Sequence, residues 1–254
     1  MILLSLALAL LPRAASAEKK VPAKEKASAE TNDPPGVRKA DEIIARHVEA
    51  LGGLEKIRAI KTLRAKGRLE QQGVELSFTL WMKRPNRSRM DVDVKLGMIV
   101  QSYNGKEAWW VNPLLGITEP AKMPEEFAEP MRRWTDFEGP LVDYKAKGHA
   151  AEYVGEEKKE SGSVHEIKLT LADGEVWRVY IDANTNLEVK RVFRQTYAGE
   201  TKDMTTWFRG YTTVAGVKIF RTIQGDGPDG TPYTMTFDRF EANVPIEDAR
   251  FDKP

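Results

Sequence analysis

Three histidines, His47, His149 and His165, are the residues of this chain best suited to proton transfer or metal binding. None of them stands in an HxxxH or HExxH arrangement, so the helical zinc site that such spacing builds is not predicted. Ser163 and His165 could share one face of a strand, but no third residue is placed to orient the histidine. The histidines therefore indicate packing roles rather than catalysis.

The segment Gly225–Gly230 carries two acids, Asp226 and Asp229, that resemble part of a calcium-binding loop. It lacks the alternating oxygen ligands and the distal glutamate of such loops, which favours a solvated hairpin turn. No phosphate-binding glycine loop and no GxSxG motif occurs in the sequence. A hydrolase of envelope lipids or glycans is the least favoured alternative, and we expect no enzyme activity, no metal and no cofactor.

The charges of the chain are balanced, with 39 Lys and Arg against 38 Asp and Glu and a formal net charge of +1. The overall charge of the protein therefore gives it no attraction to nucleic acid. The chain contains no cysteine among its 254 residues. Disulfides, thiolate metal sites, a cysteine nucleophile and a lipid-modified N-terminal cysteine are thereby excluded.

The N-terminus carries an apolar run, Ile2–Leu11, followed by the small residues Ala15-Ser16-Ala17. This pattern is typical of a signal peptide with its cleavage site, and the run is too short to span a bilayer. We interpret residues 1–17 as a signal peptide for export to the periplasm. Residues 18–36 have the Lys, Glu, Ala, Ser and Pro composition of a flexible linker, and residues 37–254 are expected to form a single domain.

Helical spacing precedes a long β pattern. Ala40, Ile44, Val48 and Leu51 recur at helical intervals before Gly52-Gly53, and Leu54–Ile60 predicts a second short helix. Period-two alternation then predicts strands that short turns join into antiparallel neighbours. The expected strands are Leu63–Gln71, Val74–Lys83, Arg87–Val94, Met98–Tyr103, Ala108–Val111, Ala151–Glu157, His165–Leu171, Glu175–Ile181, Leu187–Gln195, Met204–Tyr211, Val217–Ile223 and Tyr233–Phe240.

The strands predict one richly apolar face, because Val74, Leu76, Phe78, Leu80 and Met82 all point to the same side. The adjacent tryptophans in "YNGKEAWWVNP", at positions 109 and 110, must point to opposite faces. A long antiparallel sheet curls, and its apolar face goes inside. The interior is either a cavity for hydrocarbon chains or a fully packed core, and composition alone favours the packed core.

One apolar segment interrupts the strands. Phe127, Met131 and Trp134 fall at helical spacing within residues 123–138, where Pro124 suits a helix start and Pro130 disturbs the middle. We expect this segment to lie over the sheet as a lid, with an ordinary core helix as the alternative.

The order of several segments resembles the LolA-like outer-membrane lipoprotein-sorting proteins, in particular their larger, divergent members. The segments are "ADEIIARHVEALGGLEKIRAIKTLRAKGRL" at 40–69, "KRPNRSRMDV" at 83–92, "YNGKEAWWVNPLLG" at 103–116, "GPLVDYKAKGH" at 139–149, "YIDANTNLEVKR" at 180–191, "RGYTTVAGVKI" at 209–219 and the final "FDKP". The resemblance implies a mainly β fold with few helices, a strongly curved antiparallel sheet forming a half-open, unclosed β-barrel of about eleven strands with a helical lid. It also implies a periplasmic location and non-covalent carriage of acyl chains.

The sequence therefore predicts a periplasmic carrier of lipoprotein or lipid acyl chains, monomeric, served by transfer proteins of the inner and outer membranes. The alternative is a lipid-sensing, protein-interaction module of the cell envelope. The expected cavity and lid residues are Phe78, Leu80, Met82, Met90, Trp109, Phe127, Met131 and Trp134.

Overall fold

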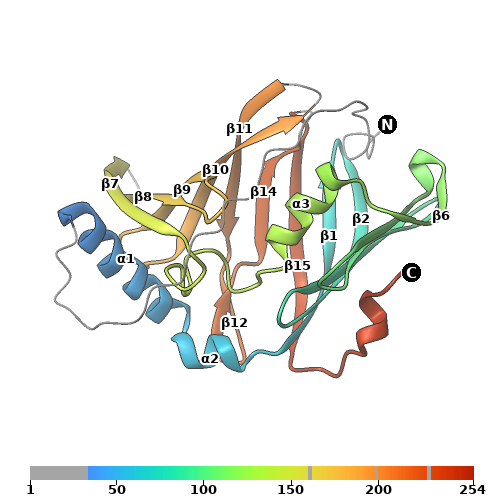
Figure 1. The fold of residues 1–254 in the computed structure, drawn as a ribbon, viewed down its shortest axis with the longest axis horizontal. Coiled ribbons are helices and arrows are strands. Elements are labelled where there is room, and N and C mark those ends of the chain that lie inside the picture. Colours follow the sequence, from blue (N-terminus) through green and yellow to red (C-terminus); the bar gives the residue numbers. More distant parts are fainter. Residues whose placement is uncertain (1–33, 160–161, 198–199, 228–229) are drawn as a thin grey trace.

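The computed structural model describes residues 34–254 except for 160–161, 198–199 and 228–229 (Figure 1). The signal peptide and nearly all of the linker expected from the sequence lie outside the described residues. The first helix, α1, spans Pro35–Leu51, so the last two residues assigned to the linker belong to this helix. Pro35 suits the first helical turn, because its missing N–H would have no intrahelical partner there.

The helices α1 and α2 (Leu54–Ala59) confirm the helical spacing read from the sequence. Gly52 and Gly53 separate them with φ values of 126° and 90°, which glycine adopts without a side-chain clash. The third helix, α3 (Glu125–Trp134), confirms the helix expected within residues 123–138 and contains Pro130. The described residues also contain two short 3-10 turns, η2 at Pro113–Leu115 and η3 at Asp248–Phe251.

Thirteen strands form one antiparallel sheet in the order β6-β5-β4-β3-β2-β1-β15-β14-β11-β10-β9-β8-β7. They are β1 Thr62–Gln71, β2 Val74–Lys83, β3 Arg87–Val94, β4 Gly97–Tyr103, β5 Ala108–Asn112, β6 Ile117–Lys122, β7 Ala150–Lys159, β8 Gly162–Thr170, β9 Val176–Asp182, β10 Glu188–Tyr197, β11 Glu200–Arg209, β14 Thr222–Asp226 and β15 Pro232–Ala242. A separate hairpin pairs β12 (Thr212–Val214) with β13 (Val217–Ile219).

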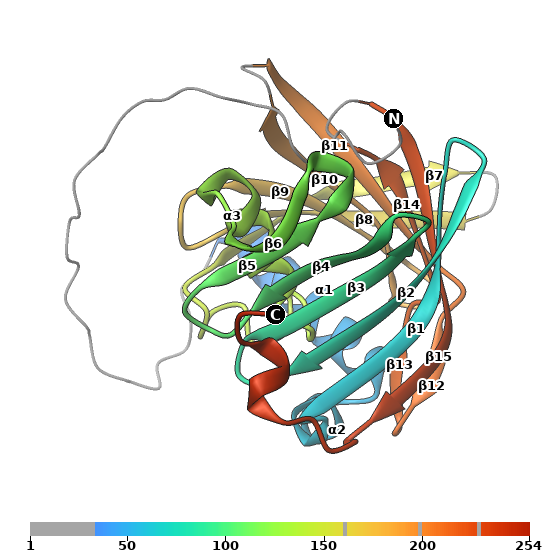
Figure 2. The same ribbon diagram turned by 90° about the vertical axis from the view of Figure 1, so that its right-hand side faces the viewer.

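The sheet is curved and not closed into a barrel, as expected, because β6 and β7 remain its two edges (Figure 2). The strand count differs from the expected eleven or so. Strand β6 was not expected, since Pro120 interrupts its pattern, and the expected strand Val217–Ile223 is divided between β13 and β14. The chain passes from β6 through α3 and residues 135–149 to β7, so this connection links the two edges.

The register carries one apolar face across the whole sheet. On this inner face Trp110 is opposite Gln101, Leu80 is opposite Met90, and Phe78 is opposite Val92. Phe78 packs edge-on against Phe237 with 5.3 Å between ring centroids. Helix α1 covers the β7–β9 part of this face by burying Ala40, Ile43 and Ile44 against Ile167, Leu169, Val179 and Ile181.

The outer face of β2–β5 is covered by the C-terminal segment. Phe251 is fully buried there, and its carbonyl oxygen accepts a hydrogen bond of 2.6 Å from the Ser102 hydroxyl. Arg250 lies over the Trp81 ring, and Lys253 lies over the Trp109 ring. The C-terminal segment therefore shields tryptophans that would otherwise be exposed on the outer side of the sheet.

Candidate acyl-chain site on the inner face of the sheet

The middle of the inner face carries large apolar side chains that are only half buried. Leu69 of β1 is flanked by Leu76 of β2 and Met235 of β15, and these three form a row across the strands. Others surround a buried cluster of Phe78, Val92, Phe208 and Phe237. The half-buried set is Leu69, Leu76, Leu80, Met90, Leu114, Tyr211, Phe220, Tyr233, Met235 and Phe240. Contiguous apolar surface of this kind marks a place where another apolar molecule can bind.

Some residues expected at the site do come together. Phe78, Leu80 and Met90 belong to the inner-face group just described, and Met82 is buried on the same face of β2. Phe127 and Met131 of α3 pack in a neighbouring group around Trp110, with 5.3 Å between the Phe127 and Trp110 ring centroids.

Two of the expected residues lie elsewhere. Trp109 pairs with Ser102 on the outer face, because alternation along β5 turns Trp110 inward and Trp109 outward. The aromatic residue of β5 on the inner face is therefore Trp110, which is 5% exposed. The expectation that Trp109 lines the inner face is wrong, because its side chain lies on the outer face. Trp134, at the end of α3, is 45% exposed and does not pack in the group around Trp110.

Helix α3 bridges the two wings of the curved sheet (Figures 1 and 2). One side is held on the β4–β6 wing by Phe127, Ala128 and Met131. Arg133 forms ion pairs with Glu175 and Asp173 in the turn between β8 and β9 on the opposite wing, the second at 3.0 Å. Apolar packing thus holds one side of the helix, and exposed or half-exposed ion pairs hold the other.

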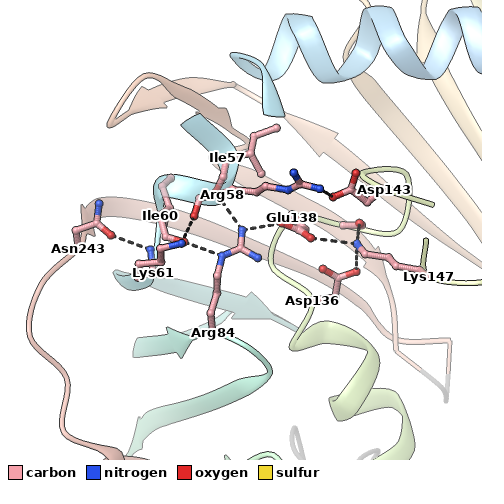
Figure 3. A network of polar contacts seen from close by, with 11 residues as sticks. Ile57, Arg58, Ile60, Lys61, Arg84, Asp136, Glu138, Asp143, Lys147 and Asn243 are labelled. Atoms are coloured by element: carbon pink, nitrogen blue, oxygen red, sulfur yellow. Dashed lines mark hydrogen bonds and ion pairs between the residues drawn. The ribbon is translucent and has the colours of Figure 1, made fainter. Parts of the chain in front are cut away.

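A polar network fixes the segment that follows α3 (Figure 3). Arg84 donates to the carbonyl oxygens of Ile60 (2.8 Å) and Ile57 (3.0 Å) at α2, and to the Glu138 carboxylate at 2.6 Å. Lys147 bonds Asp136 at 2.6 Å and the Gly139 carbonyl at 2.8 Å. Burial raises the pKa of the Asp136 carboxyl, and the Lys147 ammonium opposes that rise. The network ties residues 136–147 to α2 and to the β2–β3 turn.

Arg84→Met should lower the free energy of unfolding by about 2–4 kcal/mol, because it leaves the Glu138 carboxylate, whose side chain is 10% exposed, without its closest partner. The measurement is urea denaturation of the two proteins. The matched control is Arg58→Met in the same network: the Arg58 side chain is 57% exposed, so its ion pair with Asp143 contributes little. Equal losses from both substitutions would contradict the role given to Arg84.

The histidines have structural surroundings. His47 is on the buried side of α1 with its Nδ1 2.8 Å from the Asn186 carbonyl oxygen, and burial lowers its pKa. Nδ1 of His149 accepts a hydrogen bond from the backbone N–H of Ala172 at 3.1 Å. His165 packs edge-on against Tyr153, and its pKa is also lowered by burial. Of the three, His47 packs on the buried side of α1, as the sequence indicated.

Two hollows lie along α1, away from the half-buried apolar row. The larger, about 610 Å³, is lined by residues that include Val48, Glu49, Leu54 and Asp143, and the smaller, about 340 Å³, lies at the start of the helix. Within the described part of the chain, His, Asp and Glu side chains nowhere form a group of three or more that could hold a metal ion. No helix among the described residues is both long and apolar enough to cross a membrane.

Sequence reasoning missed several residues of the site. Met235, Tyr233 and Phe240 come from β15, far along the chain from β2. Only the pairing of β15 with β1 places Met235 opposite Leu69, with Tyr233 and Phe240 further along the same strand. A bulge in β15 opposite Lys66 and Gly67 turns both Phe237 and Phe240 inward, where their rings stack with centroids 5.3 Å apart. Alternation along β15 gave no signal for this bulge.

No protein-family model matches the sequence, and no curated protein matches it. Solved structures match the fold. A DUF1329 family protein from Desulfovibrio piger is similar with a TM-score of 0.59 at 13% identity, over 85% of this chain and 97% of the other. A LolA superfamily protein from Nitrosomonas europaea is similar with a TM-score of 0.54 at 12% identity, over 84% of this chain and 97% of the other. The structural neighbours of this chain are therefore DUF1329 and LolA superfamily proteins, whose fold it shares.

Proposed function

We propose that this protein is a non-enzymatic carrier that binds the acyl chains of a lipid or lipoprotein on the inner face of its curved sheet. The observation that carries the proposal is the half-buried apolar row Leu69, Leu76 and Met235, together with the apolar side chains around it. Covering this surface with hydrocarbon would contribute roughly 0.8 kcal/mol for each methylene removed from water. The resemblance to LolA-like sorting proteins supports the same function.

Release of the cargo requires no chemical step. Transfer by relative affinity needs neither a cofactor nor a covalent step, so the cargo leaves when another site binds it more tightly. Methionine side chains such as Met90 and Met235 adapt to chains of different shape. We place this carrier in the periplasm as a monomer that receives its cargo at the inner membrane and passes it toward the outer membrane, through transfer proteins at each.

Helix α3 is the lid of this site. It belongs to the connection between the two edge strands, so a ligand that enters between the wings must pass it or displace it. Its Arg133 side is joined to the turn between β8 and β9 by ion pairs with Glu175 and Asp173, whose side chains are both partly exposed. Such pairs contribute little net stability and can be exchanged for water. We therefore expect α3 to open at Arg133 and to stay attached at Phe127.

Tethering α3 tests both the site and its lid. The chain has no cysteine, so Arg133→Cys/Glu175→Cys provides a unique pair for a short bismaleimide cross-linker. The untethered protein should bind 1-palmitoylglycerol saturably, monitored by tryptophan emission, and the tethered protein should take it up at least about tenfold more slowly. The control is each single-cysteine variant capped with N-ethylmaleimide. Failure of the untethered protein to bind contradicts the carrier function, whereas equal uptake rates contradict the lid alone.

A further inference from the structure

A buried ion pair occupies the inner face among apolar side chains. Arg191 Nε donates to Glu188 Oε1 at 2.8 Å, and Arg191 Nη2 donates to Glu188 Oε2 at 2.9 Å. Both side chains are 10% exposed. Taking two charges out of water is costly, and apolar residues of similar size would usually be at least as stable at such a place. The pair therefore calls for a reason other than stability.

A backbone irregularity places the pair on this face. Glu188 is opposite Ile181 and Lys190 is opposite Tyr180, so the register of β10 shifts by one residue between them. In a regular strand residues 188 and 191 would point to opposite faces. The bulge turns both inward, and Arg191 lies opposite the fully buried Val179. The hydroxyl of Tyr211 donates to the Glu188 carbonyl oxygen at 2.8 Å and fixes the strand there.

Arg191 lies at the boundary between the covered and the open parts of the inner face. Its guanidinium carbon is 5.0 Å from the ring centroid of Trp177, in the core under α1, and 5.1 Å from that of Phe208, in the cluster that carries the half-buried row. Two aromatic rings and a bidentate carboxylate together hold the guanidinium in one orientation. It is a preorganised donor beside the proposed acyl-chain site.

One nitrogen of this guanidinium is unused. Nε and Nη2 are bonded to Glu188, and among the described residues Nη1 has no hydrogen-bond partner. Among the described residues, Nη1 is not one of the buried side-chain atoms that lack a hydrogen-bond partner. Because Nη1 has no partner, it must be in contact with solvent. A donor that is fixed, accessible and unpaired can bind an acceptor atom of a ligand.

We propose that Arg191 Nη1 donates a hydrogen bond to the carbonyl oxygen of an ester-linked or amide-linked acyl chain lying on the inner face. This inference rests on the proposed carrier function and adds a specificity determinant to it. The bidentate bond to Glu188 already balances the charge of Arg191, so a neutral carbonyl fits the spare donor better than a carboxylate, which would add an uncompensated charge to a buried site. The apolar row through Leu69 and Leu76 would hold the hydrocarbon of the same ligand.

Three probes with the same sixteen-carbon chain test the proposal in competition with a fluorescent fatty-acyl probe. They are 1-palmitoylglycerol (ester), N-palmitoylethanolamine (amide) and 1-O-hexadecylglycerol (ether, without a carbonyl). We expect at least one of the carbonyl probes to bind about tenfold more tightly than the ether, because one charge-assisted hydrogen bond strengthens binding by about that factor. The better of the two shows whether an ester or an amide is the natural linkage.

Variants locate the effect. Arg191→Met/Glu188→Leu removes the pair without leaving a lone charge and should reduce the carbonyl preference to less than about twofold, with ether binding unchanged. The matched control is Arg89→Met/Asp91→Leu, a bidentate pair of similar burial on the outer face, which should keep the full preference. Arg191→Lys keeps a cation beside Glu188 but lacks the planar fork, so it gives the same readout if the double variant does not fold.

The outcomes separate the two proposals. Equal binding of all three probes by the wild-type protein, or a carbonyl preference that persists without Arg191, overturns the role of Arg191 and leaves the carrier function standing. Absence of binding by every probe overturns the carrier function and this inference with it.

Discussion

Leu76→Asp should weaken binding of 1-palmitoylglycerol by at least about thirtyfold, because the incoming chain would have to desolvate a carboxylate at a cost of about 2 kcal/mol or more. Leu76 lies in the row with Leu69 and Met235 and is half buried. A charge at a half-buried position can stay in contact with water while the site is empty. The substitution should therefore lower the free energy of unfolding by only about 1–2 kcal/mol. Competition binding and urea denaturation measure the two effects separately.

Ser77→Asp is the matched control for Leu76→Asp, since Ser77 is the next residue of β2 and points to the outer face. It lies opposite Arg68 in the register, where a new carboxylate is accommodated. Binding by Ser77→Asp should equal that of the wild-type protein. Similar losses of binding in the two variants, or no loss in Leu76→Asp, would contradict binding of the acyl chain on the inner face.

Gly67→Ala should lower the free energy of unfolding by about 3 kcal/mol or more. Gly67 lies at the irregularity between β1 and β15, and a Cβ added there would stand 2.2 Å from the backbone oxygen of Thr236 and 2.7 Å from Cζ of Phe78. The backbone oxygen cannot move without breaking the pairing of β1 with β15, and overpacking of a buried site is destabilising. Thermal unfolding followed by circular dichroism measures the effect.

Gly155→Ala provides the comparison for Gly67→Ala. Gly155 is also a strand glycine beside a register shift, in β7, but a Cβ there would meet nothing within 4 Å. Its substitution should be neutral or stabilising, because alanine restricts the unfolded chain more than glycine does. A comparable destabilisation by both substitutions would mean that the contacts with Thr236 and Phe78 do not set the cost at residue 67.

Local periodicity was sufficient for the elements on which the proposal depends. The alternation of Leu76, Phe78 and Leu80 identifies the inner face of β2 because successive strand residues point to opposite sides. The four-residue spacing of Phe127 and Met131 identifies the packed side of α3. Trp134, three residues further on, continues the helical pattern yet is exposed, because periodicity does not show where a helix extends beyond the surface that it covers.

Long-range pairing decided what local patterns could not. The sequence requires Trp109 and Trp110 to face opposite ways, but only the register with β4 shows that Trp110 faces inward. The bulge between Glu188 and Lys190, which brings Arg191 onto the inner face, has no local signature in the strand pattern. The C-terminal segment that buries Phe251 on the outer face likewise depends on a contact between distant parts of the chain.

How far each residue of the inner face is buried also depends on packing that the sequence alone does not show. The apolar residues of β2 and β3 were expected either to line a cavity or to fill a core, and the structure buries them to different degrees. Phe78 and Val92 are buried, whereas Leu80 and Met90 beside them are half buried. Helix α1 covers the β7–β9 part of the inner face and α3 bridges the wings, whereas the row through Leu69 stays half buried.

The most direct test of the carrier function is native mass spectrometry of the protein purified from the cells that produce it, without detergent. The account predicts a fraction of the protein carrying an additional mass that dissociates as an acylated lipid or lipopeptide. The Leu76→Asp protein, purified in the same way, should carry much less of it. A wild-type protein that is free of any such mass, and that also fails to bind added 1-palmitoylglycerol, would contradict the central claim.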